Sequence, residues 1–122
     1  MDYLLLALGG AIGSLCRFFI SEFVYDYTGR EFPYGILTVN VVGSFLMGVL
    51  ATLIVNRFEL GPAWRMGILV GFLGGFTTFS SFSLDTVQLL QGGHAVKAIS
   101  YVLLSVILGV IATFLGILIV GE

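Results

Sequence analysis

The ten residues GGFTTFSSFS, at positions 74–83, place two glycines, five hydroxyl side chains and three phenylalanines together in an otherwise apolar region. Phe76, Phe79 and Phe82 recur every three residues, so we expect them close together on one helix face. Stripes of this kind usually form core packing. However, the edge of a phenyl ring carries partial positive charge, and hydroxyl groups donate hydrogen bonds. Because the segment contains no Lys or Arg, it also suits the passage of a small anion between neutral contacts that hold it only weakly.

The glycines before the hydroxyl groups predict a weak point in a helix. Gly71, Gly74 and Gly75 lie near the middle of an apolar stretch, and Thr77 and Thr78 follow closely. Non-helical backbone at membrane depth is tolerated only where protein or a water-filled cavity covers it. Its freed carbonyl groups are good ligands for a hard cation. We therefore expect a broken helix with a cation site, and the alternative is a continuous helix whose glycines form a packing seam.

Polar residues in two other apolar stretches are further candidates. Asn40 carries an amide that is costly to leave unpaired in hydrocarbon. It either hydrogen-bonds another helix or lines a polar path. Tyr101, Ser105, Gly109 and Thr113 are four residues apart and therefore form one stripe of a helix. That stripe is either a small, polar packing face or one wall of a hydrophilic track.

Few charged or reactive side chains lie inside the apolar stretches. Arg17 either snorkels to the membrane interface or faces a water-filled vestibule. Asp85 is the only carboxylate well inside a stretch. We expect His94 to be solvated in a turn and the single Cys16 to be a packing residue. The sequence contains no nucleophile–base pair, metal cluster or phosphate-binding loop, so we expect no enzyme.

The composition indicates an all-α membrane protein. Of the 122 residues, 58% are hydrophobic and only 10% are charged, which is too apolar for a soluble domain. About 20 apolar residues of helix cross a bilayer, and four stretches are long enough. We expect one four-span transmembrane domain over residues 1–122, its third helix broken near the middle, with spans at about 3–25, 35–56, 66–91 and 97–120.

The basic residues of the expected loops are balanced between the two sides. Arg57 and Arg65 fall on one side, and Arg30 and Lys97 on the other. Because Lys and Arg set orientation through their bias to the cytoplasmic side, this balance favours a chain that inserts both ways and pairs antiparallel. The alternative is that one loop charge or the lipid composition decides. Four short spans enclose a polar pathway poorly, so we expect an oligomer.

Three features together resemble a known family, the Fluc (CrcB) fluoride channels of bacteria. They are the segment GGFTTFSSFSLD, the segment TVNVVGSF and an Arg in the first span. The resemblance covers essentially the whole chain. It implies an antiparallel dual-topology homodimer in the bacterial plasma (inner) membrane, which exports fluoride passively from the cytoplasm and so relieves its toxicity. The implied partners are fluoride, a second copy and membrane lipid, with no nucleic acid.

The resemblance also assigns site residues by their place in the motifs. A central sodium ion at the dimer interface would be held by backbone carbonyls of Gly74 and Thr77, and Arg17 would lie at the vestibule. Asp85 stands where many relatives have Glu, and Gly109 where some have Ser. The implied fluoride pore comprises two phenylalanines, an asparagine and four hydroxyl-bearing side chains, namely Phe79, Phe82, Asn40, Ser80, Tyr101, Ser105 and Thr113.

Two other functions fit parts of the pattern. A small proton-coupled multidrug-type exporter is equally short and needs a titratable carboxylate in its binding chamber. Glu22 lies near the end of the first span, and Asp85 is in the third. A non-conducting subunit of a larger membrane complex would use the small-residue faces for packing alone.

Overall fold

The computed structural model describes residues 2–56 and 61–121, and the regular elements within them are helices. The first, second and last passes are single α-helices, whereas the third pass is made of four consecutive pieces. The elements in chain order are α1 (Asp2–Thr28), α2 (Tyr34–Asn56), α3 (Pro62–Arg65), the π-helix η1 (Met66–Phe72), α4 (Leu73–Phe76), α5 (Phe79–Gln91) and α6 (Ala95–Gly121).

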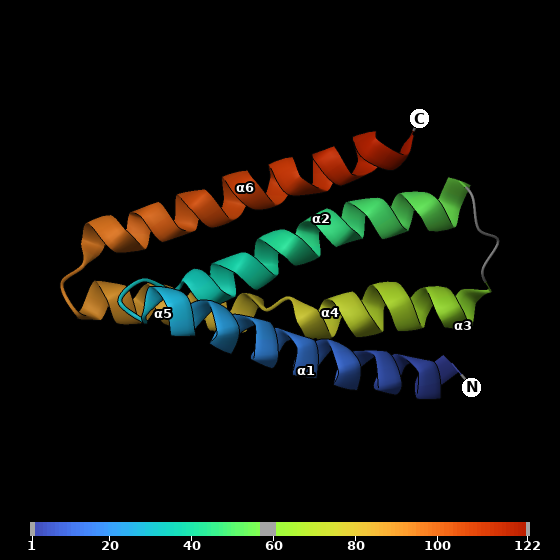
Figure 1. Ribbon diagram of the computed structural model, residues 1–122, viewed down its shortest axis with the longest axis horizontal. Helices are drawn as coiled ribbons and strands as arrows, with labels where there is room; N and C mark the ends of the chain where they lie inside the picture. Colours follow the sequence, from blue (N-terminus) through green and yellow to red (C-terminus); the bar gives the residue numbers. More distant parts are fainter. Residues whose placement is uncertain (1, 57–60, 122) are drawn as a thin grey trace.

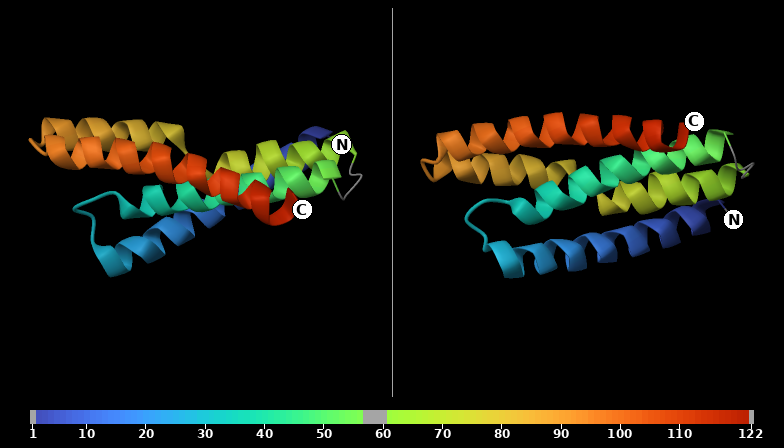
Figure 2. Two further views of the ribbon diagram at one scale, coloured as in Figure 1. Left: turned by 90° about the horizontal axis from the view of Figure 1, so that it is seen from above. Right: turned by 45° about the horizontal axis from the view of Figure 1, so that its top comes forward.

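Successive passes run in opposite directions along one long axis, which is horizontal in Figure 1, and both chain ends lie at the same end of the bundle. Helix α2 contacts both α1 and α6. The third pass divides its contacts: η1 and α4 lie against α1, whereas α5 lies against α6. Figure 2 shows the same division from two further directions. The middle of the third pass therefore lies where the chain changes from one neighbouring helix to another.

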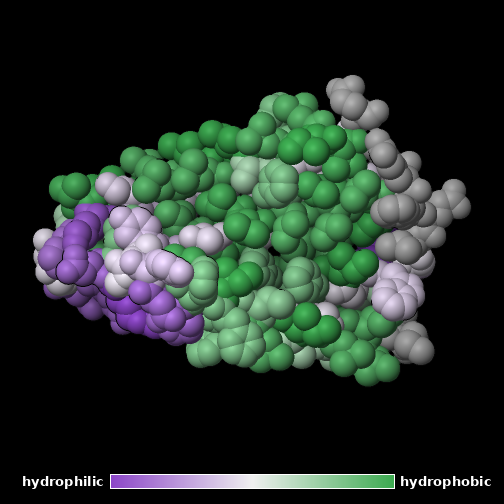
Figure 3. Space-filling view, in the orientation of Figure 1, coloured by the Kyte–Doolittle hydropathy of each residue, from purple (hydrophilic) through white to green (hydrophobic). Residues whose placement is uncertain are grey.

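Four helical segments are long and apolar enough to cross a membrane, namely Tyr3–Thr28, Tyr34–Ile54, Pro62–Gln91 and Ala95–Gly121. They confirm the four expected spans, with ends that differ by a few residues. The surface is apolar along most of the long axis and hydrophilic at the end where α5 turns into α6 (Figure 3). The protein is therefore a multi-pass membrane protein. Arg57, which enters the expected charge balance, lies outside the described residues.

Glycine and proline set several helix ends. Gly29 follows α1 with φ of +77°, and its N–H donates to the Tyr25 carbonyl over 2.8 Å. Gly93 has φ of +80° in the turn between α5 and α6. Both residues therefore occupy left-handed backbone, which glycine adopts without the strain of a side chain. Pro62 begins α3, the position where its missing N–H costs no helical bond.

A seam of small residues joins α1 to the first half of the third pass. A Cβ added to Gly9 would overlap the Gly67 carbonyl oxygen, and one added to Gly13 would overlap that of Phe72. On the other side of the seam, a Cβ on Gly75 would lie 2.6 Å from the Gly10 oxygen. Gly9 and Gly13 are four residues apart, the spacing of small residues that lets membrane helices approach closely, and their contacts hold η1 and α4 against α1.

The backbone leaves the helical conformation between α4 and α5. Thr77 has φ and ψ of −89° and 159°, and Thr78 has −151° and 114°, so both are extended. Gly74 and Gly75, where the sequence suggested the weak point, are helical residues of α4. The reason is that Gly75 packs tightly against α1, whereas β-branched threonines favour extended backbone.

Candidate ion pathway

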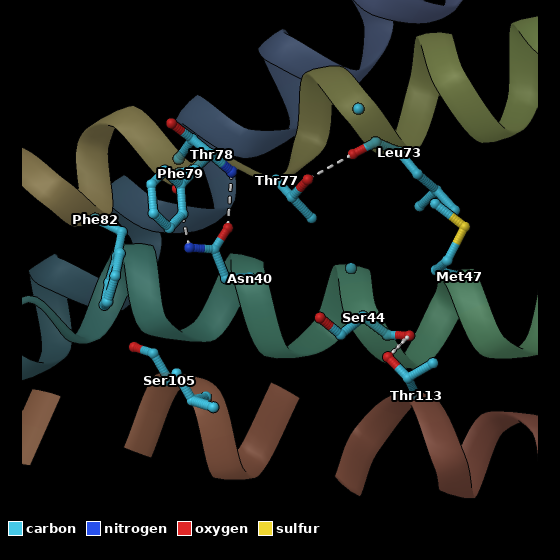
Figure 4. A pocket seen from close by; sticks show the side chains of 13 residues that line it. Asn40, Ser44, Met47, Leu73, Thr77, Thr78, Phe79, Phe82, Ser105 and Thr113 are labelled. Carbon is cyan, nitrogen blue, oxygen red and sulfur yellow. Dashed lines mark hydrogen bonds between the residues drawn. The ribbon is translucent and has the colours of Figure 1, made fainter. Parts of the chain in front are cut away.

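A cavity of about 360 Å³ opens beside the extended pair, between α2, the third pass and α6 (Figure 4). Its walls are apolar and hydroxyl-bearing side chains with one amide, and none of them is charged. The lining residues are Asn40, Gly43, Ser44, Met47, Leu73, Gly74, Thr77, Thr78, Phe79, Phe82, Ser105, Val106 and Thr113. The predicted residues Asn40, Phe79, Phe82, Ser105 and Thr113 thus meet here, together with both predicted cation-binding positions, Gly74 and Thr77.

Asn40 on α2 holds the extended pair through two hydrogen bonds to one residue (Figure 4). The Thr78 N–H donates to Asn40 Oδ1 over 2.8 Å, and Asn40 Nδ2 donates to the Thr78 carbonyl over 3.1 Å. An unpaired peptide group at membrane depth is costly, so this amide stabilises the non-helical backbone. Asn40 also lines the cavity. The two roles that the sequence left open, linking elements of the bundle and lining a polar space, are therefore both present.

Two carbonyl groups at the extended pair do not have the partners that a continuous helix would give them. In a continuous α-helix, the Thr78 N–H would donate to Gly74, and the Ser81 N–H would donate to Thr77. Instead the Thr78 N–H goes to Asn40, and the Ser81 N–H donates to Thr78 Oγ1 over 3.2 Å as the N-cap of α5. The Gly74 and Thr77 carbonyls consequently lose their helical donors, which leaves two hard oxygen atoms at the same turn of the chain.

The two predicted pore phenylalanines lie next to each other at the start of α5. The ring centroids of Phe79 and Phe82 are 5.6 Å apart, with an angle of 45° between the ring planes, and both rings line the cavity. Phe76 does not share their face, because the extended pair turns the chain between them. Its ring is 2% exposed and stacks with Phe72 at 6.0 Å. The expected cluster of three rings is therefore wrong at Phe76, which is a core residue.

The hydroxyl groups around the cavity differ in whether their hydrogen is already donated to another group of the chain. The Thr113 hydroxyl lies 3.0 Å from the Ser44 carbonyl and 3.1 Å from that of Gly109, so its one hydrogen is engaged. Ser105 Oγ is buried without a hydrogen-bond partner among the residues that the structure describes. Ser80 does not line the cavity, and its hydroxyl lies 3.3 Å from Thr78 Oγ1. The hydroxyl hydrogen of Ser105, a residue of the cavity wall, is therefore not taken up by another group in the described part of the chain.

Tyr101 lies behind the cavity wall rather than in it. Its side chain is fully buried, and its ring centroid is 5.1 Å from that of Phe82. The Tyr101 hydroxyl donates to Asp85 Oδ2 over 3.1 Å. Asp85 in turn lines a second hollow of about 290 Å³, whose wall also includes Arg30 and Gln88. Tyr101 and Phe82 therefore separate the central cavity from a more polar hollow near one end of the bundle.

Arg17 is not part of either hollow. It is a half-buried residue of α1, the helix that packs against η1, α4 and α2. Its vestibule role stays a prediction. Gly109 is near Ser44, since an added Cβ would lie 3.5 Å from Ser44 Oγ.

Sequence reasoning missed several residues that share the cavity wall. Gly43 and Met47 follow Asn40 on α2 at helical spacing, and Val106 neighbours Ser105 on α6. Their spacings of three and seven residues from Asn40, which fall on one helix face, are the signal that could have found the first two. The local sequence marks Thr78, the partner of Asn40, only as a weak helix former. Its two bonds to Asn40 span 38 residues of chain, which no local pattern reveals, whereas its N-cap bond to Ser81 is local.

Comparison with known proteins shows the family of the chain. A family model described as CrcB-like protein, Camphor Resistance (CrcB), matches residues 4–117. Three similar proteins are each named fluoride-specific ion channel FluC. The one from Methylococcus capsulatus is 50% identical over 111 residues, which cover 91% of this chain and 49% of that protein. Those from Citrifermentans bemidjiense and Acidobacterium capsulatum are 46% and 41% identical, over 93% and 98% of this chain and 92% and 95% of theirs. The chain therefore spans about half of the first relative and nearly all of the other two, and it belongs to the CrcB-like family.

Proposed function

We propose that this protein is a fluoride channel that lets the ion leave the cytoplasm passively across the bacterial inner membrane. The observation that carries the proposal is the uncharged cavity within the membrane-spanning bundle, lined by Phe79, Phe82, Asn40 and Ser105. The names of its relatives support fluoride as the ion. Because those relatives are ion channels, transport rather than catalysis is the activity.

The chemistry of the cavity suits a small, strongly hydrated anion. Ring edges of Phe79 and Phe82 offer weak positive charge, and the Ser105 hydroxyl has a hydrogen to donate. Asn40 Nδ2 carries two hydrogens, of which one is donated to Thr78. These contacts replace water without a fixed positive charge that would trap the ion, which is the balance that conduction requires.

The conducting unit that we propose is an antiparallel homodimer. Phe79 is 78% exposed on the single chain although it lines the cavity. Gly74 is also exposed, and a Cβ added there would meet nothing within 4 Å. A second copy packed against this face would cover the ring and complete the wall. The balanced loop charges in the sequence support insertion in both orientations.

The sodium ion expected at the dimer interface fits the carbonyl geometry of the third pass. The Gly74 and Thr77 carbonyls have lost their helical donors to Asn40 and Thr78. Backbone oxygens are the ligands that a hard cation prefers where a membrane helix is interrupted. When bound there, the cation would make the interior more favourable for an anion through Coulomb attraction. We propose that Gly74 and Thr77 of both copies hold it, at the interruption of the third transmembrane helix.

Fluoride efflux from liposomes tests the function directly. Purified protein is reconstituted into vesicles loaded with fluoride, and an electrode records release after a potassium ionophore permits charge balance. We expect rapid release without a proton gradient, and slow release from a Phe82→Ile variant. Release that requires a proton gradient would favour the small exporter. Vesicles that retain fluoride would favour a non-conducting subunit.

A further inference from the structure

Asn40 accepts a hydrogen bond from the Thr78 N–H, which in a continuous helix would donate to the Gly74 carbonyl. In α4, the Thr77 N–H still donates to the Leu73 carbonyl over 3.0 Å. The next N–H along the chain, that of Thr78, would reach the Gly74 carbonyl in a continuing helix. It donates to Asn40 Oδ1 over 2.8 Å instead. The Asn40 side chain therefore decides whether the Gly74 carbonyl accepts a helical hydrogen bond or stays free.

We propose that Asn40 is a positioning residue for the cation site as well as part of the anion pathway, so that one carboxamide couples the two. This inference rests on the proposed function. The second bond, from Asn40 Nδ2 to the Thr78 carbonyl over 3.1 Å, fixes the orientation of the amide and of the extended residue together. The other Nδ2 hydrogen remains available to the cavity that Asn40 lines. The hydrogen bond from the Thr78 N–H to Asn40 thus leaves the Gly74 carbonyl free for a cation. The same bond orients Asn40 Nδ2, the donor for the anion.

The burial of Thr78 makes this arrangement depend on Asn40. Thr78 is 8% exposed, and its peptide N–H is costly to leave without an acceptor at membrane depth. If the amide of Asn40 is removed, the nearest alternative acceptor along the chain is the Gly74 carbonyl. Pairing with Thr78 would withdraw that oxygen from a cation. Loss of Asn40 therefore weakens sodium binding through the backbone, even though Asn40 is not itself a proposed sodium ligand.

The sequence offers a clean probe for this coupling. Thr77 and Thr78 are the only two consecutive threonines in the chain. With threonine labelled by ¹³C at the carbonyl and by ¹⁵N at the amide, a carbonyl–amide correlation spectrum contains one signal, from the Thr77 carbonyl and the Thr78 N–H. Sodium is titrated against a large organic cation at constant ionic strength, with the full-length protein in lipid nanodiscs.

In the wild-type protein, we expect sodium to move the Thr77 carbonyl signal in a saturable way. In Asn40→Ala, we expect the Thr78 N–H signal to change position without sodium, and the sodium dissociation constant to rise at least about tenfold, the effect of about one well-placed hydrogen bond. Ser105→Ala is the matched control, because it removes a cavity hydroxyl that has no bond to the extended pair. Its sodium dissociation constant should remain within about twofold of wild type.

Equal sodium affinity in Asn40→Ala and wild type would overturn the proposal, as would a wild-type signal that does not respond to sodium. If Asn40→Ala does not fold, Asn40→Asp is used at neutral pH. Its carboxylate keeps an acceptor for the Thr78 N–H but lacks the hydrogen that Asn40 Nδ2 donates to the Thr78 carbonyl, so the signal should move but should still respond to sodium. A lost response would contradict the inference. Fluoride efflux is measured separately, so a silent channel with the expected sodium behaviour would reject the proposed function alone.

Discussion

The hydroxyl of Tyr101 on α6 donates a hydrogen bond of 3.1 Å to Asp85 on α5. The Tyr101 ring is fully buried and lies between the rings of Phe32, at 5.6 Å, and Phe82, at 5.1 Å. The same tyrosine therefore contacts both a carboxylate and the phenylalanine that lines the central cavity. This contact holds the position of α5 against α6 and so the position of the cavity wall.

Replacing Tyr101 by Phe should weaken both stability and transport. The variant keeps the ring but removes the donor to Asp85, so the free energy of unfolding should fall by about 1 kcal/mol. Fluoride efflux should also slow, because the ring at position 101, which packs against Phe82 in the cavity wall, is no longer held by Asp85. Unfolding in detergent and electrode-recorded efflux measure the two effects. Tyr3→Phe, at a residue that is 84% exposed, is the control. Additive effects of Tyr101→Phe and Asp85→Asn in a double-mutant cycle would contradict the coupling.

Replacing Phe79 or Phe82 by Ile should slow fluoride efflux at least about tenfold, since a contact of about 1.4 kcal/mol corresponds to this factor. Isoleucine keeps an apolar side chain but has no electropositive edge. The control is Phe18→Ile, an exposed ring of α1 that is not in the cavity wall. Initial efflux rates per channel measure the effect. Wild-type rates in both variants would remove the ring edges from the pathway.

Ser105 and Thr113 should separate transport from stability. Ser105 Oγ has no partner in the described part of the chain, so Ser105→Ala should slow efflux without lowering the free energy of unfolding. The Thr113 hydroxyl bonds the Ser44 carbonyl of α2. Thr113→Val should therefore cost about 0.6 kcal/mol of stability, the average for such bonds in a membrane bundle, with the smaller effect on efflux. The reverse order of effects would show that Thr113 is the donor to the ion.

Gly74→Ala should leave the single chain intact and weaken the proposed dimer. An added Cβ meets nothing within 4 Å in one copy, so a loss of dimer on dilution in lipid must come from the second copy. Gly75→Ala is the contrasting variant, because its Cβ would lie 2.6 Å from the Gly10 oxygen. It should destabilise the chain itself by about 1–3 kcal/mol. A Gly74→Ala dimer as stable as wild type would place this face away from the interface.

The four spans could be predicted because their length and composition answer one physical requirement. A bilayer demands about 20 apolar residues in a form that pairs all backbone groups internally, and each expected span overlaps a segment long and apolar enough to cross it. The close contact at Gly9 and Gly13 can also be predicted from sequence, because two small residues four positions apart mark a helix face that packs closely. These features depend on local sequence alone.

The details of the third pass could not be read in the same way. The glycines suggested the weak point, yet Gly75 is held helical by α1, and the extended residues are Thr77 and Thr78. The bonds that stabilise them come from Asn40, which lies on α2. Phe76 was likewise misplaced, because a face assigned by helical periodicity does not continue through extended backbone. Long-range partners, rather than propensity, decide this part of the structure.

The π-helix η1, from Met66 to Phe72, winds more residues into each turn than the α-helices on either side of it. Side chains before and after it therefore do not follow one common period. Gly67 lies inside this segment and Gly75 beyond it, and both contact α1. An alignment that passed through η1 without a gap, against a relative that winds the same stretch as ordinary α-helix, would match the wrong glycine to this contact.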